Sequence, residues 1–138
     1  MVEILSLFFL EIDEPNRKLN WVRAGHDPAI LFDPTTGAFE ELTGEGMALG
    51  VVDDYAYQMY TRDGWAPGSV LVVETDGIHE TRNDQNVMFG HDRLRQIVRD
   101  NHSATADEIQ NAVLTALQSF RGKLSQEDDV TIVVVKLL

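Results

Sequence analysis

The feature that most constrains this chain is an unbroken run of branched apolar residues, Val70–Val73, that ends in Glu-Thr-Asp-Gly. Such a run is typical of a β-strand that is buried on both faces. A second apolar strand is predicted at Val130–Leu137, directly after the acidic residues Glu127, Asp128 and Asp129. If these strands are antiparallel neighbours, the end of the first lies beside the start of the second, and their acidic residues meet at one edge of a sheet.

The remaining segments predict an α+β fold. Short apolar or alternating segments joined by polar turns predict mostly antiparallel strands at Leu5–Ile12, Leu19–Ala24, Ala29–Phe32, Ala38–Leu42, Tyr55–Thr61 and Ser69–Thr75. Helical spacing of apolar residues then predicts helices over Asp92–Asn101 and Asp107–Phe120. Thr105 and Glu108 form a capping box before the second helix, and Gly122 can end it. No internal boundary is evident, so we expect a single domain over residues 1–138.

Composition narrows the classes of function. The chain has 138 residues, of which 43% are hydrophobic, enough for a real core. Its formal net charge of −12 argues against a nucleic-acid partner and against an anionic membrane. It has no cysteine and no apolar run long enough to span a bilayer. We therefore expect a cytoplasmic protein without disulfide bonds or a thiolate metal site.

The acidic residues at the two strand ends predict a metal site. Carboxylates held close together repel each other unless a cation lies between them. Convergence of Asp76 with Asp128 or Asp129 therefore predicts oxygen ligands for Mg²⁺ or Mn²⁺. Gly77 would let the backbone approach the ion, because it has no Cβ. The alternative is that Asp-Gly forms an ordinary turn and that the acidic loop serves only solubility.

A colinear series of short motifs carries a family resemblance. The motifs are Ala-Gly-His-Asp-Pro-Ala at 24–29, Gly-Met-Ala-Leu-Gly at 46–50, Pro-Gly-Ser at 67–69, Thr-Asp-Gly-Ile-His-Glu at 75–80, Phe-Gly with Arg-Leu at 89–94, and Asp-Asp-Val-Thr at 128–131. In order and spacing they resemble the metal-dependent, type 2C protein serine/threonine phosphatases. The resemblance is to the SpoIIE/RsbU-like branch in particular.

The resemblance implies an α-β-β-α sandwich with two Mn²⁺ or Mg²⁺ ions in the intact domain. It also implies hydrolysis of phosphoserine or phosphothreonine on an anti-sigma-factor antagonist-type protein, with a sensor or receiver domain in the parent protein. Matched residue by residue, Asp76 and Asp128 are the metal ligands, and Asp129 orients the loop by hydrogen bonding. The assignment of Asp128 and Asp129 can be exchanged without changing the argument.

Three further residues are candidates for supporting roles. Glu80 can brace the loop or bind a metal-held water. His26 can contact phosphate, but a histidine in a glycine turn more often fixes that turn through hydrogen bonds. His79 is close to the predicted site, although the family usually has a small polar residue there, so we do not expect it to be catalytic.

The chain departs from the family pattern at one point, because it lacks the upstream Asp-x-x-Gly-His-Gly motif. It therefore resembles the C-terminal part of the catalytic domain, a partial sandwich without the N-terminal strands and helix. We expect this chain alone to hold at most one ion loosely and to be a poor catalyst. Exposed sheet edge predicts self-association, such as a homodimer. The alternatives are a non-catalytic partner-binding module that retains the fold and a plain acidic ion-binding domain.

Overall fold

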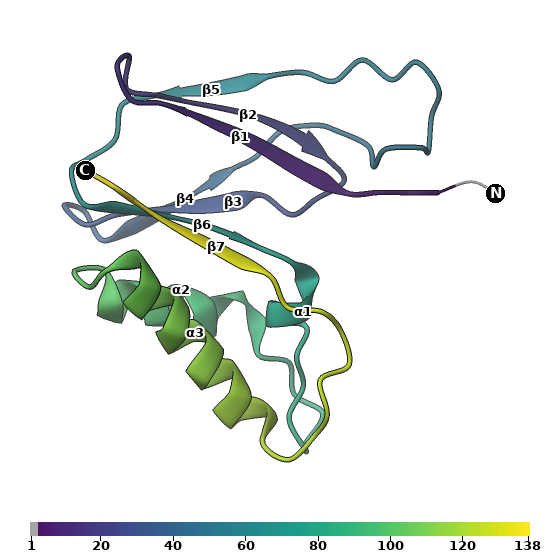
Figure 1. Ribbon diagram of the computed structural model, residues 1–138, viewed down its shortest axis with the longest axis vertical. Helices are drawn as coiled ribbons and strands as arrows, with labels where there is room; N and C mark the ends of the chain where they lie inside the picture. Colours follow the sequence, from purple (N-terminus) through teal and green to yellow (C-terminus); the bar gives the residue numbers. More distant parts are fainter. Residues whose placement is uncertain (1–2) are drawn as a thin grey trace. The chain divides into compact units, whose positions relative to one another are not determined.

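The computed structural model describes residues 3–138 and divides the chain into two compact units. The first unit comprises the residues up to Ala29 together with Glu41–Trp65, and the second comprises Ile30–Glu40 and Ala66–Leu138. Each unit is built on one antiparallel sheet (Figure 1). Within the described residues, no helix is long and apolar enough to cross a membrane.

The sheet of the first unit has the strand order β1-β2-β5. β1 (Leu7–Asp13) and β2 (Lys18–Ala24) form the predicted hairpin, and β5 (Tyr60–Asp63) pairs with the other edge of β2. Trp21 on β2 is buried, stacks on the Tyr60 ring and donates its indole N–H to the Thr43 carbonyl at 2.8 Å. These contacts tie the sheet to the loop that follows Leu42.

The prediction of a strand from Tyr55 to Thr61 is wrong at its start, because β5 begins only at Tyr60. The loop at Gly44–Gly46 occupies the edge of β2 with which residues 55–59 would have to pair. The Gly25 N–H donates to the Gly46 carbonyl at 2.8 Å, and the Arg23 guanidinium donates to the Gly44 carbonyl at 2.7 Å. Gly46 also approaches the Arg23 carbonyl so closely that a Cβ could not fit. With this edge of β2 filled, the preceding residues have no strand partner.

The sheet of the second unit has the strand order β4-β3-β6-β7. β3 (Ala29–Asp33) and β4 (Ala38–Leu42) precede β6 (Ser69–Glu74), and β7 (Ile132–Leu137) ends the chain. β6 is central and antiparallel to β3 on one side and to β7 on the other. Val70, Leu71 and Val72 are all buried, which confirms that both faces of this strand are covered.

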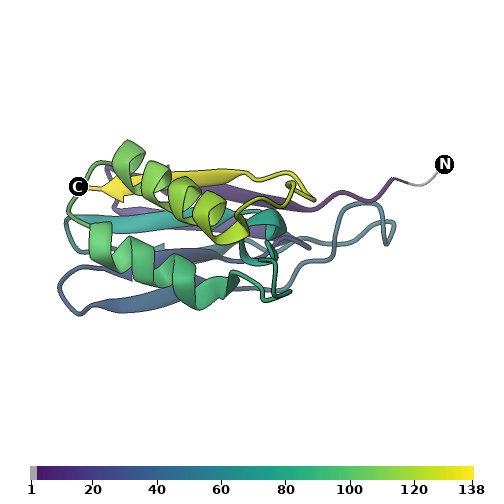
Figure 2. The ribbon, with the colours of Figure 1, turned by 90° about the horizontal axis from the view of Figure 1, so that it is seen from below.

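Helices cover one face of this second sheet (Figures 1 and 2). α2 (Gly90–Asn101) and α3 (Ala106–Arg121) lie side by side on it, and α3 begins with the predicted capping box, in which Thr105 Oγ1 accepts from the Glu108 N–H. The core between sheet and helices consists of Ile30, Phe32, Val70, Val72, Ile78, Phe89, Leu94, Val98, Ile109, Val113, Leu117 and Ile132.

The α+β class is confirmed, with two antiparallel sheets and helices against one of them. One element was not expected: α1 (Asp76–His79) is a one-turn helix that follows β6 directly. Its sequence reads as a turn because one helical turn is too short to show a periodicity of 3.6 residues. Its burial of Ile78 anchors it to the core of the second unit.

Candidate metal centre

The pairing of β6 with β7 brings two acidic segments to one end of the second sheet. Its register runs from Ser69 opposite Leu137 to Glu74 opposite Ile132, so the end of β6 lies beside the start of β7. Hydrogen bonds between Thr75 and Thr131 extend the pairing beyond the strands. The Thr75 N–H donates to the Thr131 carbonyl at 3.0 Å, and the Thr131 N–H donates to Thr75 Oγ1 at 3.0 Å. The expected antiparallel arrangement of these strands is therefore confirmed.

Gly77 joins the two segments through a backbone contact. A Cβ added to Gly77 would lie far closer to the Asp129 carbonyl oxygen than the 3.0 Å that real Cβ atoms keep, and 3.5 Å from Val130 Cγ2. The φ angle of Gly77 is helical rather than left-handed, so the backbone conformation itself does not require glycine. Glycine is needed here because the first turn of α1 packs directly on the backbone of the acidic loop.

A pocket of about 500 Å³ lies at this junction within the second unit. It is lined by Gly77, Glu80, Thr81, Arg82, Met88, Arg121, Leu124, Ser125, Glu127 and Asp128. Three predicted site residues, Gly77, Glu80 and Asp128, thus share one pocket. Two guanidinium groups, from Arg82 and Arg121, line the same space as the carboxylates, so the pocket offers both charges to a ligand.

Asp76 and Asp129 are adjacent to this pocket in the sequence but do not line it. Asp76 is the first residue of α1, and its side chain is 60% exposed. Asp129 lies in the exposed loop before β7, and its backbone N–H donates to Asp128 Oδ1 at 2.8 Å. The Asp128 carboxylate thus accepts this hydrogen bond within the loop. From the sequence, we expected Asp129 to orient the loop.

His26 belongs to the first unit, where it follows β2. Its Nδ1 lies 2.8 Å from the Asp27 carbonyl, and its own carbonyl accepts a hydrogen bond from Arg23 Nε at 2.9 Å. Its ring also lies against Phe8, with centroids 6.1 Å apart. These contacts hold the glycine turn.

Sequence reasoning missed two residues beside α1, Glu74 and His91. Glu74 is buried at the end of β6, and its Oε1 lies 3.3 Å from Nδ1 of both His79 and His91. The strand periodicity could have pointed to Glu74, because it shares the face of Val70 and Val72 that is covered by helices. No local pattern points to His91, which reaches Glu74 only because α2 packs near α1.

Comparison with known proteins places this geometry in a family. The model of the family described as stage II sporulation protein E (SpoIIE) matches residues 3–138. Protein IcfG of Synechocystis is 28% identical over 98% of this chain, and phosphoserine phosphatase RsbU of Bacillus subtilis is 23% identical over 96% of it. The chain spans only 21% of IcfG and 38% of RsbU.

Solved structures share the fold. The SiaA-PP2C domain of Pseudomonas aeruginosa superposes with a TM-score of 0.82 at 24% identity, over 96% of this chain and 51% of that one. The manganese-presoaked phosphatase domain of SpoIIE from Bacillus subtilis gives a TM-score of 0.72 at 17% identity, over 96% of this chain and 56% of that one. The relatives thus include phosphatases, which are hydrolases. Because the family model covers nearly the whole chain, this protein belongs to the SpoIIE family.

Proposed function

We propose that this chain carries part of the metal site and substrate pocket of a protein phosphatase that hydrolyses phosphoserine or phosphothreonine. The observation that carries the proposal is the antiparallel pairing of β6 and β7, which brings Asp76 and the Asp128–Asp129 loop to one end of a sheet. Family membership and the phosphoserine phosphatase activity named for RsbU support it.

The residues present fit a hard divalent cation, Mn²⁺ or Mg²⁺. Asp76 and Asp128 provide carboxylate oxygens, with Asp129 as the alternative ligand, and Mg²⁺ and Mn²⁺ prefer oxygen ligands. The close approach of Gly77 to the Asp129 backbone keeps both acidic segments in register. When bound, such ions neutralise phosphoryl oxygens and lower the pKa of a coordinated water.

The pocket supplies the protein's own contribution to substrate binding. Arg82 and Arg121 line it, and guanidinium groups pair with phosphate oxygens through two parallel hydrogen bonds. In a chain of net charge −12, these two residues make the pocket locally receptive to a phosphorylated side chain. Glu80 also lines the pocket, and its carboxylate can accept a hydrogen bond from a bound water.

We infer that the substrate is a phosphorylated antagonist-type protein in a sigma-factor pathway. A sensor or receiver domain in the parent protein would control the reaction in the cytoplasm. The ligand set of this chain holds at most one ion, and loosely, so the isolated chain is inactive. The edge strand β1 exposes Leu7 and Phe9, which favours a homodimer.

Thermal unfolding with and without Mn²⁺ tests the metal site. At a Mn²⁺ concentration about tenfold above the dissociation constant, binding to the folded state adds about 1.4 kcal/mol and raises Tm by a few degrees. Asp76→Asn and Asp128→Asn should each abolish this rise. Asp53→Asn is the matched control, because it removes one exposed carboxylate in the first unit.

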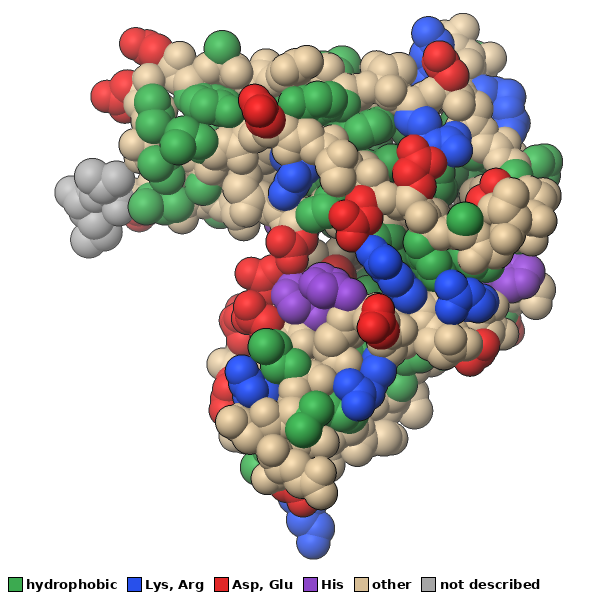
Figure 3. All heavy atoms as spheres, turned by 180° about the vertical axis from the view of Figure 1, so that it is seen from behind, with side chains coloured by type: hydrophobic (Ala, Val, Ile, Leu, Met, Phe, Trp, Pro, Cys, Tyr) green, Lys and Arg blue, Asp and Glu red, His purple; other side chains and the backbone are tan. Residues whose placement is uncertain are grey.

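The control matters because acidic side chains are frequent on the surface (Figure 3) and attract Mn²⁺ without a defined site. Equal Mn²⁺ responses in Asp76→Asn and Asp53→Asn would refute the metal site. Hydrolysis of a chromogenic phosphate ester tests the inactivity of the isolated chain separately. Robust Mn²⁺-dependent turnover would show that this ligand set suffices, and a non-catalytic binding module would then be excluded.

A further inference from the structure

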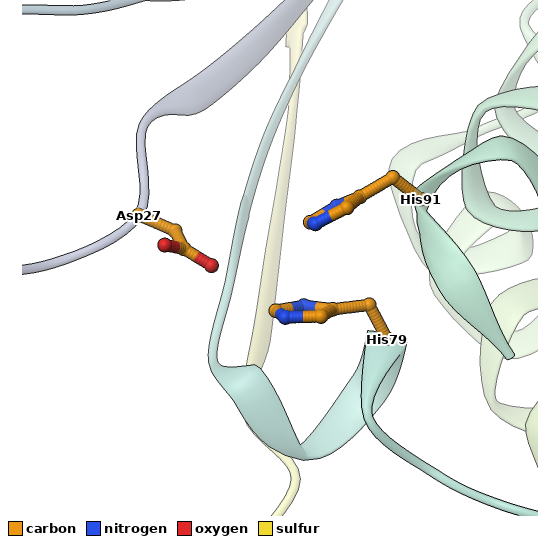
Figure 4. A group of neighbouring side chains, drawn as sticks. All are labelled: Asp27, His79 and His91. Carbon is orange, nitrogen blue, oxygen red and sulfur yellow. The ribbon is translucent and has the colours of Figure 1, made fainter. Parts of the chain in front are cut away.

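We propose that His79 and His91, supported by the buried Glu74, form a second metal site that takes a transition-metal ion such as Zn²⁺ rather than Mn²⁺ or Mg²⁺. His79 is the last residue of α1 and His91 lies in the first turn of α2. Their rings stack with centroids 4.1 Å apart and an angle of 27° between the planes (Figure 4). A ring nitrogen of one lies within 4.8 Å of a ring nitrogen of the other, so modest ring rotations bring both to one ion.

The buried Glu74 carboxylate lies beside both rings. Its side chain is only 8% exposed, and its Oε1 lies 3.3 Å from both Nδ1 atoms. A carboxylate on the Nδ1 side of a histidine favours the tautomer with the proton on Nδ1, which leaves the Nε2 lone pair for a metal. Metal-binding histidines in proteins commonly have a carboxylate in this position.

Asp76 is the candidate third ligand inside the same unit, and it lies beside His79. Asp76 Oδ1 lies 3.9 Å from His79 Nε2, and the Asp76 side chain is 60% exposed. His91 is 55% exposed, so an ion can reach the pair from solvent, and histidine side chains are visible at the surface in Figure 3. Asp27, the remaining residue labelled in Figure 4, belongs to the first unit.

The donor set selects the class of ion. Two imidazole nitrogens and one carboxylate oxygen match Zn²⁺, which binds such ligands at about 2.0–2.2 Å. Imidazole also suits Cu²⁺ and Ni²⁺, whereas Mg²⁺ and Mn²⁺ prefer oxygen. The second site thus shares Asp76 with the manganese site proposed above but differs from it in both histidines. Zn²⁺ bound there withdraws Asp76 from Mn²⁺, so the two ions compete.

Isothermal titration calorimetry with Zn²⁺ and the visible absorption of Co²⁺ test the site directly. His91→Gln is the main variant, because His91 is exposed and its loss should not disturb the core. It should lower Zn²⁺ affinity at least about tenfold and abolish the absorption of the Co²⁺ complex. His102→Gln is the matched control, since His102 also lies in the second unit but packs at a tilt against Phe32, outside the cluster. Unchanged Zn²⁺ affinity in His91→Gln would overturn the proposal.

A second pair of variants separates this site from the manganese site. Asp128→Asn should abolish the Mn²⁺-dependent rise in Tm and leave Zn²⁺ affinity unchanged, whereas His91→Gln should do the reverse. Glu74→Gln should lower Zn²⁺ affinity by about 10- to 100-fold if it folds, because it removes only the orienting carboxylate. If Zn²⁺ affinity falls in Asp128→Asn but not in His91→Gln, the acidic loop binds Zn²⁺ and the histidine site is refuted.

Discussion

Replacing Gly77 by alanine would test the contact that joins α1 to the acidic loop. The added methyl would overlap the Asp129 carbonyl oxygen and lie 3.0 Å from its carbonyl carbon. Since both neighbours are backbone, no side chain can rotate away, and α1 must separate from the segment before β7. Forcing an extra methyl group into packed surroundings costs about 1–3 kcal/mol. That cost is comparable to losing one or two of the Thr75–Thr131 hydrogen bonds.

For a chain of this length we expect Gly77→Ala to lower Tm by about 3–10 °C, measured by circular dichroism. It should also weaken the Mn²⁺-dependent stabilisation, because the two acidic segments move apart. Gly37→Ala is the control: Gly37 has a left-handed φ of 71° and open space around an added Cβ. It should lower stability by about 1–2 kcal/mol through backbone strain alone and leave the Mn²⁺ response intact. A Gly77→Ala protein with unchanged Tm and Mn²⁺ response would refute the reasoning.

Two further predictions concern self-association through the edge strand β1 and the pH dependence of stability at Asp33. Phe9 on β1 is 49% exposed, so light scattering should detect a dimer or larger species that Phe9→Glu dissociates; a clean monomer of the unmodified chain would contradict this. The Thr35 hydroxyl and N–H donate to Asp33 Oδ1 and hold the Asp33 pKa below its usual 3.8. Because the folded-state pKa is lowered, this stabilisation is present above the unfolded-state pKa and is lost as pH falls through the folded-state value. Urea unfolding below pH 4 should therefore show a flatter loss of stability in Asp33→Asn, and identical pH profiles would exclude the effect.

Most of the fold follows from local sequence. The unbroken apolar run at Val70–Val73 predicts a strand buried on both faces, and β6 is one. The capping box at Thr105 predicts the start of α3, because it satisfies backbone N–H groups that a helix leaves open. Prediction failed where tertiary contacts compete with local preference. The aromatic segment before Tyr60 looks like a strand, but the loop at Gly44–Gly46 holds the edge of β2 that it needs.

The candidate site likewise has one part that the sequence predicts and one part that depends on tertiary contacts. Sequence order and strand pairing predict that Asp76 and the Asp128–Asp129 segment come to one end of a sheet, since antiparallel neighbours necessarily align the end of one strand with the start of the other. The contributions of Arg82 and Arg121 to the pocket were not predictable. Arg82 forms an isolated β-bridge with Met88 and Arg121 is the last residue of α3, and no local sequence pattern connects the two.

The sequence by itself determined the two buried strands, the capped helix and the acidic residues at the strand ends. These features rest on preferences that act over a few neighbouring residues, such as side-chain alternation, helical periodicity and capping. Only the tertiary structure decided that Gly77 lies against the Asp129 carbonyl and that His79 and His91 stack beside Glu74. Those contacts depend on how α1 and α2 pack on the end of β6, and packing is set by the shape of the whole core rather than by any local pattern.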